Sequence, residues 1–165
     1  MHTLIAEPMR RGLLWIAAIG MSALAVFALA PEAGAEIDPS VKTASGMTVY
    51  LGVIPAPIVR GHPLAHPEAT MHGGPPSGKS ERHIVVALFD AKTFERITNA
   101  DVEATVEGLG HIGAVSKKLE RMDIADAPTF GNYFPFQGPD KYTVRLKITA
   151  QGYKGPVILE FTYSV

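Results

Sequence analysis

The sequence predicts an all-β protein, an immunoglobulin-like antiparallel β-sandwich of about seven strands. Polar and apolar residues alternate in several short segments, turn residues recur at intervals of about 8 to 12 residues, and no apolar repeat has the period of a helix. Cysteine is absent from the chain. Such a domain would therefore rely on its hydrophobic core instead of disulfides, and metal sites built from thiolates are excluded.

Residues 1–35 are expected to be an export signal and not part of the fold. Arg10 and Arg11 give the segment a positive start, an uncharged and mainly apolar run of 18 residues follows, and Ala33-Gly34-Ala35 has the small residues of a cleavage site. Cleavage after Ala35 would release a periplasmic protein. If the segment stayed uncleaved, its apolar run would be at the short limit for a membrane anchor.

Charge and hydropathy exclude two kinds of partner for the mature protein. Without the signal, the chain has 13 basic and 14 acidic residues. This near-neutral balance gives no electrostatic reason to bind nucleic acid or an anionic membrane surface. No second apolar stretch approaches the length of a membrane span, so we expect no membrane association after cleavage.

The expected strands follow a flexible lead-in, residues 36–46, and form one domain over residues 47–165. Residues 47–54 alternate and are followed by prolines that end a strand, whereas residues 83–89 are a continuous apolar run typical of a central strand. The clearest pattern is a hairpin with one wet face, formed by residues 142–149 and 157–164. Further strands are expected at 101–107, 115–124 and 130–136, with a brief pairing at Arg96 and Ile97.

A loop rich in proline, glycine and histidine connects the first two of these strands. Four of the six histidines lie between positions 62 and 83, beside Glu68 and Met71, and the prolines and glycines of residues 60–81 predict no helix. Imidazole is the commonest protein metal ligand. Histidine with a thioether favours copper, and histidine with a carboxylate favours iron, zinc or manganese.

The spacing within this loop leaves the grouping of its ligands open. In an extended chain, His66, Glu68 and His72 would share one face and Met71 would take the other. His66 and Glu68 would then lie about 6.6 Å apart along the strand, whereas His72 would be about 20 Å from His66. Either the chain bends, or His72 serves another site, or a two-fold dimer brings a distant histidine to a half-built site.

The segment His66-Pro67-Glu68-Ala69-Thr70-Met71-His72 resembles a His-x-Glu-Ala-x-x-His pattern of the periplasmic iron-transport proteins that accompany ferrous permeases. A looser likeness extends over residues 47–150 and includes Met122. The family resemblance implies an immunoglobulin-like fold, copper or iron ligands at His66 and Glu68, and a copper ligand at Met122. Thr129 stands where that family has a metal-binding histidine. A weaker likeness to YtkA-like and CopC-like copper-associated domains covers residues 83–107.

Taken together, these observations predict a non-catalytic periplasmic protein that binds copper or ferrous iron in metal uptake or tolerance. An inner-membrane metal permease or exporter is the expected partner. No catalytic motif is present except a phosphate-loop pattern, residues 73–80, which no helix-forming segment follows. The alternative is an immunoglobulin-like interaction module of an envelope complex that binds no metal. The candidate ligands are His66 and Glu68, completed by His72, Met71, Met122 and His62, whereas His83 and Met122 also suit structural roles in a strand and in the core.

Overall fold

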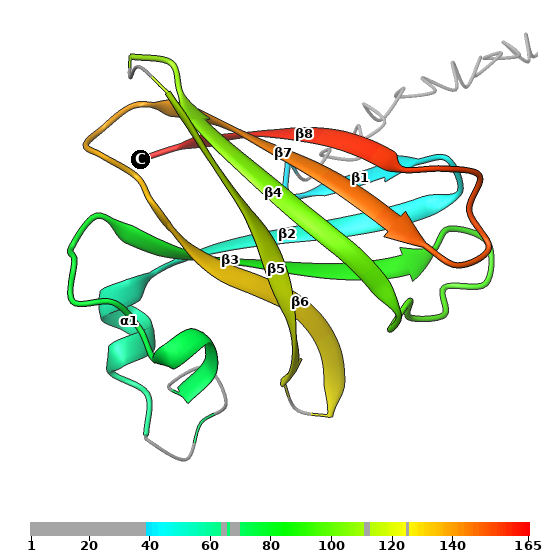
Figure 1. The fold of residues 1–165 in the computed structure, drawn as a ribbon, viewed down its shortest axis with the longest axis horizontal. Coiled ribbons are helices and arrows are strands. Elements are labelled where there is room, and N and C mark those ends of the chain that lie inside the picture. Colours follow the sequence, from blue (N-terminus) through cyan, green and yellow to red (C-terminus); the bar gives the residue numbers. More distant parts are fainter. Residues whose placement is uncertain (1–38, 64–65, 67–69, 111–112, 125) are drawn as a thin grey trace, which may run out of the picture. The chain divides into compact units, whose positions relative to one another are not determined.

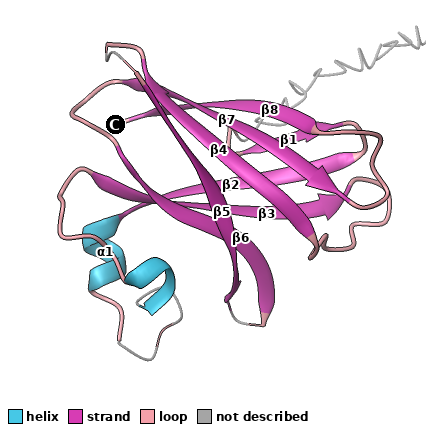
Figure 2. Cartoon of the chain, viewed as in Figure 1, coloured by secondary structure: helices cyan, strands magenta, loops and turns pink. Residues whose placement is uncertain are grey.

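The computed structural model describes residues 39–63, 66, 70–110, 113–124 and 126–165, and the elements within them are almost entirely strands (Figure 2). The expected signal, residues 1–35, and Glu68 lie outside the described residues. The all-β prediction is confirmed, and the described residues form eight strands where about seven were expected. In chain order the elements are β1 (Val41–Ala44), β2 (Met47–Pro55), α1 (Ala56–Arg60), η1 (Met71–Gly73), β3 (Glu81–Asp90), β4 (Ala100–Gly108), β5 (Ala114–Ile124), β6 (Ala127–Pro135), β7 (Lys141–Ala150) and β8 (Val157–Ser164).

The strands form one antiparallel sheet in the order β1-β2-β3-β6-β5-β4-β7-β8. The long strand β5 joins its two halves, because its first part pairs with β4 and its last part pairs with β6. Figure 1 shows β4 crossing in front of β2 and β3. Lys42 of β1 donates a hydrogen bond to the carbonyl of Glu160 in β8 at 2.6 Å, so the two edge strands of the sheet approach each other. The architecture is therefore sandwich-like, and its assignment to the immunoglobulin type stays a prediction.

The hydrophobic core lies between the two halves of this sheet, as the alternation in the sequence predicts. On β3, Ile84, Val86 and Leu88 are fully buried in this core, so the residues between them face the outside of the sheet. On the predicted C-terminal hairpin, the buried residues are those expected to share the apolar face. They are Tyr142, Val144, Leu146 and Ile148 on β7, and Val157, Leu159 and Phe161 on β8.

Two expectations about the N-terminal part of the domain were wrong. Val41–Ala44, expected to belong to a flexible lead-in, form β1 because they pair in register with the alternating strand β2. Residues 60–81 were expected to contain no helix, but they include the single turn η1, and α1 extends to the first of them. These short elements tolerate the surrounding prolines, since Pro57 occupies the first turn of α1, where no backbone amide is required. Neither described helix is long and apolar enough to cross a membrane.

α1 lies against β2 and β3, and His72 of η1 lies against Tyr133 of β6. Ala56 and Val59 of α1 pack with Ile54 of β2 and Tyr133 of β6 in a small cluster separate from the main core. Arg60 donates a hydrogen bond to the carbonyl of Pro76 and so ties α1 to the far end of the loop. Figure 1 shows α1 below β2 and β3.

Candidate metal centre

The pairing of β3, β6 and β5 gathers chemically distinct side chains on the outer face of the sheet. His83 lies opposite Tyr133, while Met122 lies opposite Thr129 and Glu120 opposite Gly131. Because paired residues in antiparallel strands project from the same face, an imidazole, a phenol, a thioether and a carboxylate share one surface. Met122 is buried but does not belong to the main core cluster, in agreement with this placement.

His83 is the buried base of this group. Its side chain is completely inaccessible to solvent, and its ring stacks on that of Tyr133 with centroids 4.6 Å apart and planes inclined by 23°. Burial, and to a smaller extent electrostatic repulsion from His72 when that ring is protonated, lower the pKa of His83 to about 4. At neutral pH this imidazole is therefore uncharged, which is the state that coordinates a metal.

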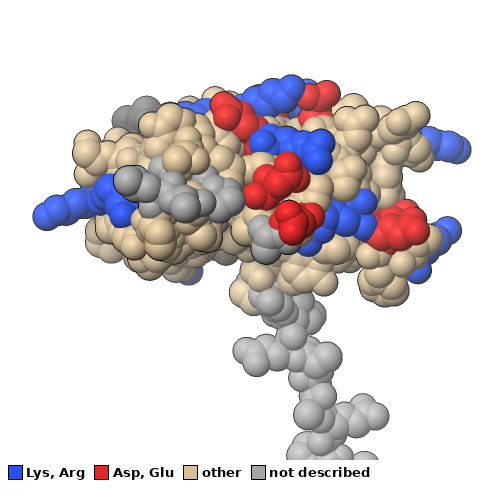
Figure 3. Space-filling view, turned by 90° about the horizontal axis from the view of Figure 1, so that it is seen from below, with Lys and Arg blue, Asp and Glu red and all other residues tan. Residues whose placement is uncertain are grey.

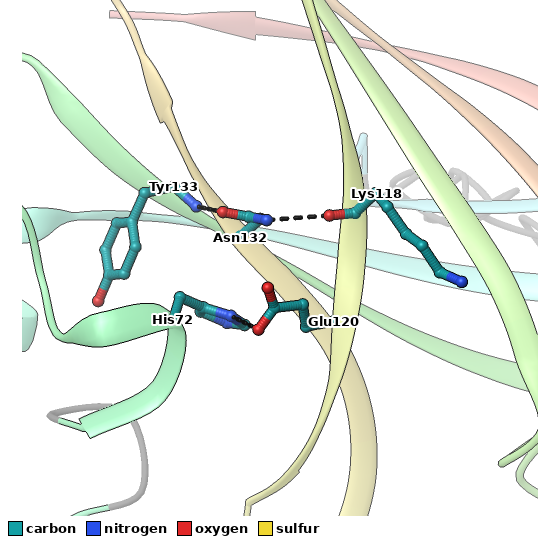
Figure 4. A network of polar contacts seen from close by, with 5 residues as sticks. All are labelled: His72, Lys118, Glu120, Asn132 and Tyr133. Carbon is teal, nitrogen blue, oxygen red and sulfur yellow. Dashed lines mark hydrogen bonds and ion pairs between the residues drawn. The ribbon is translucent and has the colours of Figure 1, made fainter.

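His72 reaches the same place from η1. Its backbone has a φ of 57° and a ψ of 27°, in the left-handed region. The ring centroid lies 5.4 Å from that of His83 and 6.1 Å from that of Tyr133. Nδ1 is 2.8 Å from Oε2 of Glu120 (Figure 4), and the side chain is only 4% exposed. Its other ring nitrogen, Nε2, is buried and has no hydrogen-bond partner among the described residues.

Met122 and His83 meet above Gly131, where the absence of a side chain leaves room for both. A Cβ atom placed on Gly131 would lie 2.6 Å from Cε of Met122 and 2.8 Å from Nε2 of His83. The thioether end and the imidazole nitrogen therefore converge on one point of β6. Thr129 lies beside them, and its hydroxyl donates a hydrogen bond to the carbonyl of Met122 at 3.3 Å.

Asn132 fastens β5 to β6 beside the cluster. Its side-chain amide donates to the carbonyl of Lys118 at 2.9 Å and accepts from the backbone N–H of Tyr133 at 2.8 Å (Figure 4). These bonds fix the strand that carries Tyr133 relative to the strand that carries Glu120. Figure 3 shows acidic and basic side chains intermixed on the face seen from below, so neither sign dominates there.

The structure brings together only some of the ligands predicted from the sequence. His72 and Met122 join the cluster, whereas His62 and His66 form a separate pair with ring centroids 4.5 Å apart. The extended-chain premise, under which His72 shares a face with His66 and Glu68, is wrong at residues 71–73, which form a turn. Met71 lies partly buried in that turn. The roles of His66 and Glu68 stay a prediction.

Three members of the cluster were not in the predicted ligand set: His83, for which a structural role was preferred, and Glu120 and Tyr133, which were not considered. The sequence contains one signal for His83, since it stands out of phase with the inward-facing residues of its own strand. The other two depend on which strands become neighbours. Among the described residues, no group of three or more histidine, cysteine, aspartate or glutamate side chains is arranged to hold a metal. A centre at this place therefore requires the thioether of Met122 beside the two imidazoles.

Solved structures share this fold at low sequence identity. FetP from uropathogenic Escherichia coli is 13% identical with a TM-score of 0.59, over 76% of this chain and 91% of that protein. A copper-bound variant of P19 from Campylobacter jejuni is 9% identical with a TM-score of 0.58, over 76% of this chain and 93% of the other. A DUF4426 family protein from Pseudomonas aeruginosa is 14% identical with a TM-score of 0.57, over 76% and 94%. No family model and no curated protein matches the chain.

These matches define the class of fold to which the chain belongs. It is the all-β architecture found in FetP and in P19, and FetP was obtained by expression in a bacterial periplasm. The resemblance to periplasmic iron-transport and copper-associated proteins inferred from the sequence is thus confirmed at the level of the fold.

Proposed function

We propose that this chain is a periplasmic carrier that binds a copper ion through His72, His83 and Met122. It acts in metal uptake or tolerance and is not an enzyme. The observation that carries the proposal is Nε2 of His72, a buried nitrogen without a partner among the described residues. The ring of His72 lies 5.4 Å from that of His83, centroid to centroid, and His83 in turn converges with Met122 above Gly131. A buried polar atom without a partner costs about 1–3 kcal/mol, and a bound metal would offset this cost.

The chemistry of the donors favours copper over ferrous iron. Two imidazoles and a thioether form a soft ligand set, whereas a site for iron would be expected to include carboxylates as direct ligands. The carboxylate in this cluster, Glu120, contacts Nδ1 of His72. It therefore lies on the opposite side of the ring from Nε2. The copper-bound P19 structures support this choice, since they have the same fold.

In this proposal, the other ligands predicted from the sequence form an outer site that the ion meets first. The pair formed by His62 and His66 lies on the same loop as His72, and Glu68 follows it in the sequence. These residues would capture the ion before it reaches the buried centre. A homodimer is not required to gather His72, His83 and Met122, because one chain supplies all three. A membrane permease or exporter remains the proposed partner that receives or delivers the ion.

A competitive titration of the metal-free protein with Cu(I) and a chromophoric chelator tests the proposal. The wild-type protein is expected to bind one Cu(I) per chain, and both His72→Ala and Met122→Leu are expected to weaken binding at least tenfold, about 1.4 kcal/mol. His66→Ala serves as the matched control, because it removes a histidine of the same loop from outside the buried cluster. A wild-type protein that ignores copper would refute the proposal and favour the metal-free interaction module. A greater loss in His66→Ala than in His72→Ala would place the main site in the outer pair.

A further inference from the structure

We propose that Glu120 is the positioning residue of this centre: it holds His72 in the tautomer and orientation that present Nε2 to the metal. This inference rests on the proposed function and extends it to a residue that does not itself touch the ion. Glu120 and His72 are separated by 48 positions in the sequence, so the contact depends on the fold and not on local spacing.

The hydrogen bond determines where the proton of His72 lies. Nδ1 of His72 is 2.8 Å from Oε2 of Glu120. A carboxylate accepts hydrogen bonds and donates none, so Nδ1 must carry the hydrogen. A neutral imidazole has one such hydrogen, and the lone pair is therefore on Nε2, the buried nitrogen without a described partner. Metal-binding histidines are commonly oriented in this way by a carboxylate on their second nitrogen.

The contrast in exposure argues that this contact is more than a surface ion pair. The side chain of Glu120 is 61% exposed, while that of His72 is 4% exposed. A pair between two exposed side chains would contribute little to stability, and its geometry would not matter to a buried site. Here the exposed carboxylate fixes the ring of a buried partner, as Figure 4 shows, with the phenol of Tyr133 on the other side of the ring.

The backbone at His72 gives a second reason why the ring must be held from outside. Its φ of 57° lies in a region that non-glycine residues seldom adopt, and Gly73 and Gly74 follow it with positive φ values. The turn therefore depends on contacts elsewhere to keep its conformation. The hydrogen bond to Glu120 links this turn to β5, the strand that also carries Met122.

Long-range ¹H–¹⁵N correlation spectra of the histidine rings test the inference in metal-free protein purified after expression of the full chain. In the wild type, His72 is expected as the Nδ1–H tautomer, and Glu120→Ala is expected to shift His72 towards the Nε2–H tautomer. Cu(I) affinity should then fall 10- to 100-fold in this variant. Glu120→Gln should restore most of the binding, since its amide oxygen still accepts a hydrogen bond from Nδ1.

Asp123→Ala is the matched control, because Asp123 lies on the same strand, is also 61% exposed, and pairs with Arg121 at 3.5 Å. It should change neither the tautomer nor the affinity. A wild-type His72 that carries its hydrogen on Nε2, or on both nitrogens, would overturn the inference, as would unchanged Cu(I) affinity in Glu120→Ala while the wild type binds copper. If the wild type binds no copper, the proposed function fails, and the tautomer of the metal-free protein still decides whether Glu120 positions His72.

Discussion

Gly131→Ala is expected to abolish copper binding and to destabilise the protein by about 1–3 kcal/mol. The added Cβ would lie 2.6 Å from Cε of Met122, 2.8 Å from Nε2 of His83 and 2.9 Å from the carbonyl oxygen of Ile84. The methionine end can rotate away, but the carbonyl belongs to the backbone of the neighbouring strand β3, and its movement would disturb the sheet. Urea denaturation and Cu(I) titration of the variant measure the two effects.

Gly52→Ala provides the control for this prediction. Gly131 of β6 and Gly52 of β2 both pair with Val85 of β3, from opposite sides of that strand. Both glycines therefore lie on the outer face of the sheet. A Cβ on Gly52 would lie 3.8 Å from the nearest atoms of Val85, which is an ordinary contact. This variant should fold with almost unchanged stability and bind copper. Equal behaviour of the two variants would show that the space above Gly131 is not needed.

The metal-free protein is expected to lose stability between pH 6.5 and pH 4 because of His83. The pKa of His83 falls from 6.5 to about 4 on folding, mainly through burial. Between these values His83 is protonated in the unfolded chain but not in the native protein, so the free energy of unfolding decreases as the pH is lowered. The contribution of this one group amounts to about 3 kcal/mol by pH 4.

Comparison with His83→Phe isolates this effect, since phenylalanine keeps an aromatic ring against Tyr133 but cannot ionise. The readout is the dependence of the unfolding free energy on pH, measured by urea denaturation of both proteins, and it does not require equal stability at pH 7. The wild-type curve should be steeper than that of the variant between pH 6.5 and pH 4. Parallel curves would mean that His83 is protonated as easily in the native protein as in the unfolded chain.

Much of the fold could be predicted from the sequence because alternation reports directly which residues face the core. The hairpin of β7 and β8 and the central strand β3 were predicted close to their observed limits. β1 could not be recognised, since its four residues carry no apolar alternation and are ordered by pairing with β2. The short helices escaped prediction because a single turn requires few backbone hydrogen bonds and tolerates nearby prolines.

The composition of the site was easier to predict than its geometry. The density of histidine indicated a metal, but the spacing along the chain left open whether His72 groups with His66 or serves another site. The turn at residues 71–73 instead directs His72 towards β3 and β5. His83 is as buried as a structural histidine, yet the pairing of β3 with β6 and of β6 with β5 places Met122 nearby. Such convergence follows from strand order, which alternation within single strands does not contain.

Copper K-edge X-ray absorption spectra of the loaded protein show which atoms bind the metal. We expect a first coordination shell with one sulfur and two imidazole nitrogens, and we expect the sulfur to be absent in Met122→Leu. A shell of nitrogen and oxygen alone, identical in the wild type and in Met122→Leu, would show that copper binds elsewhere on the chain.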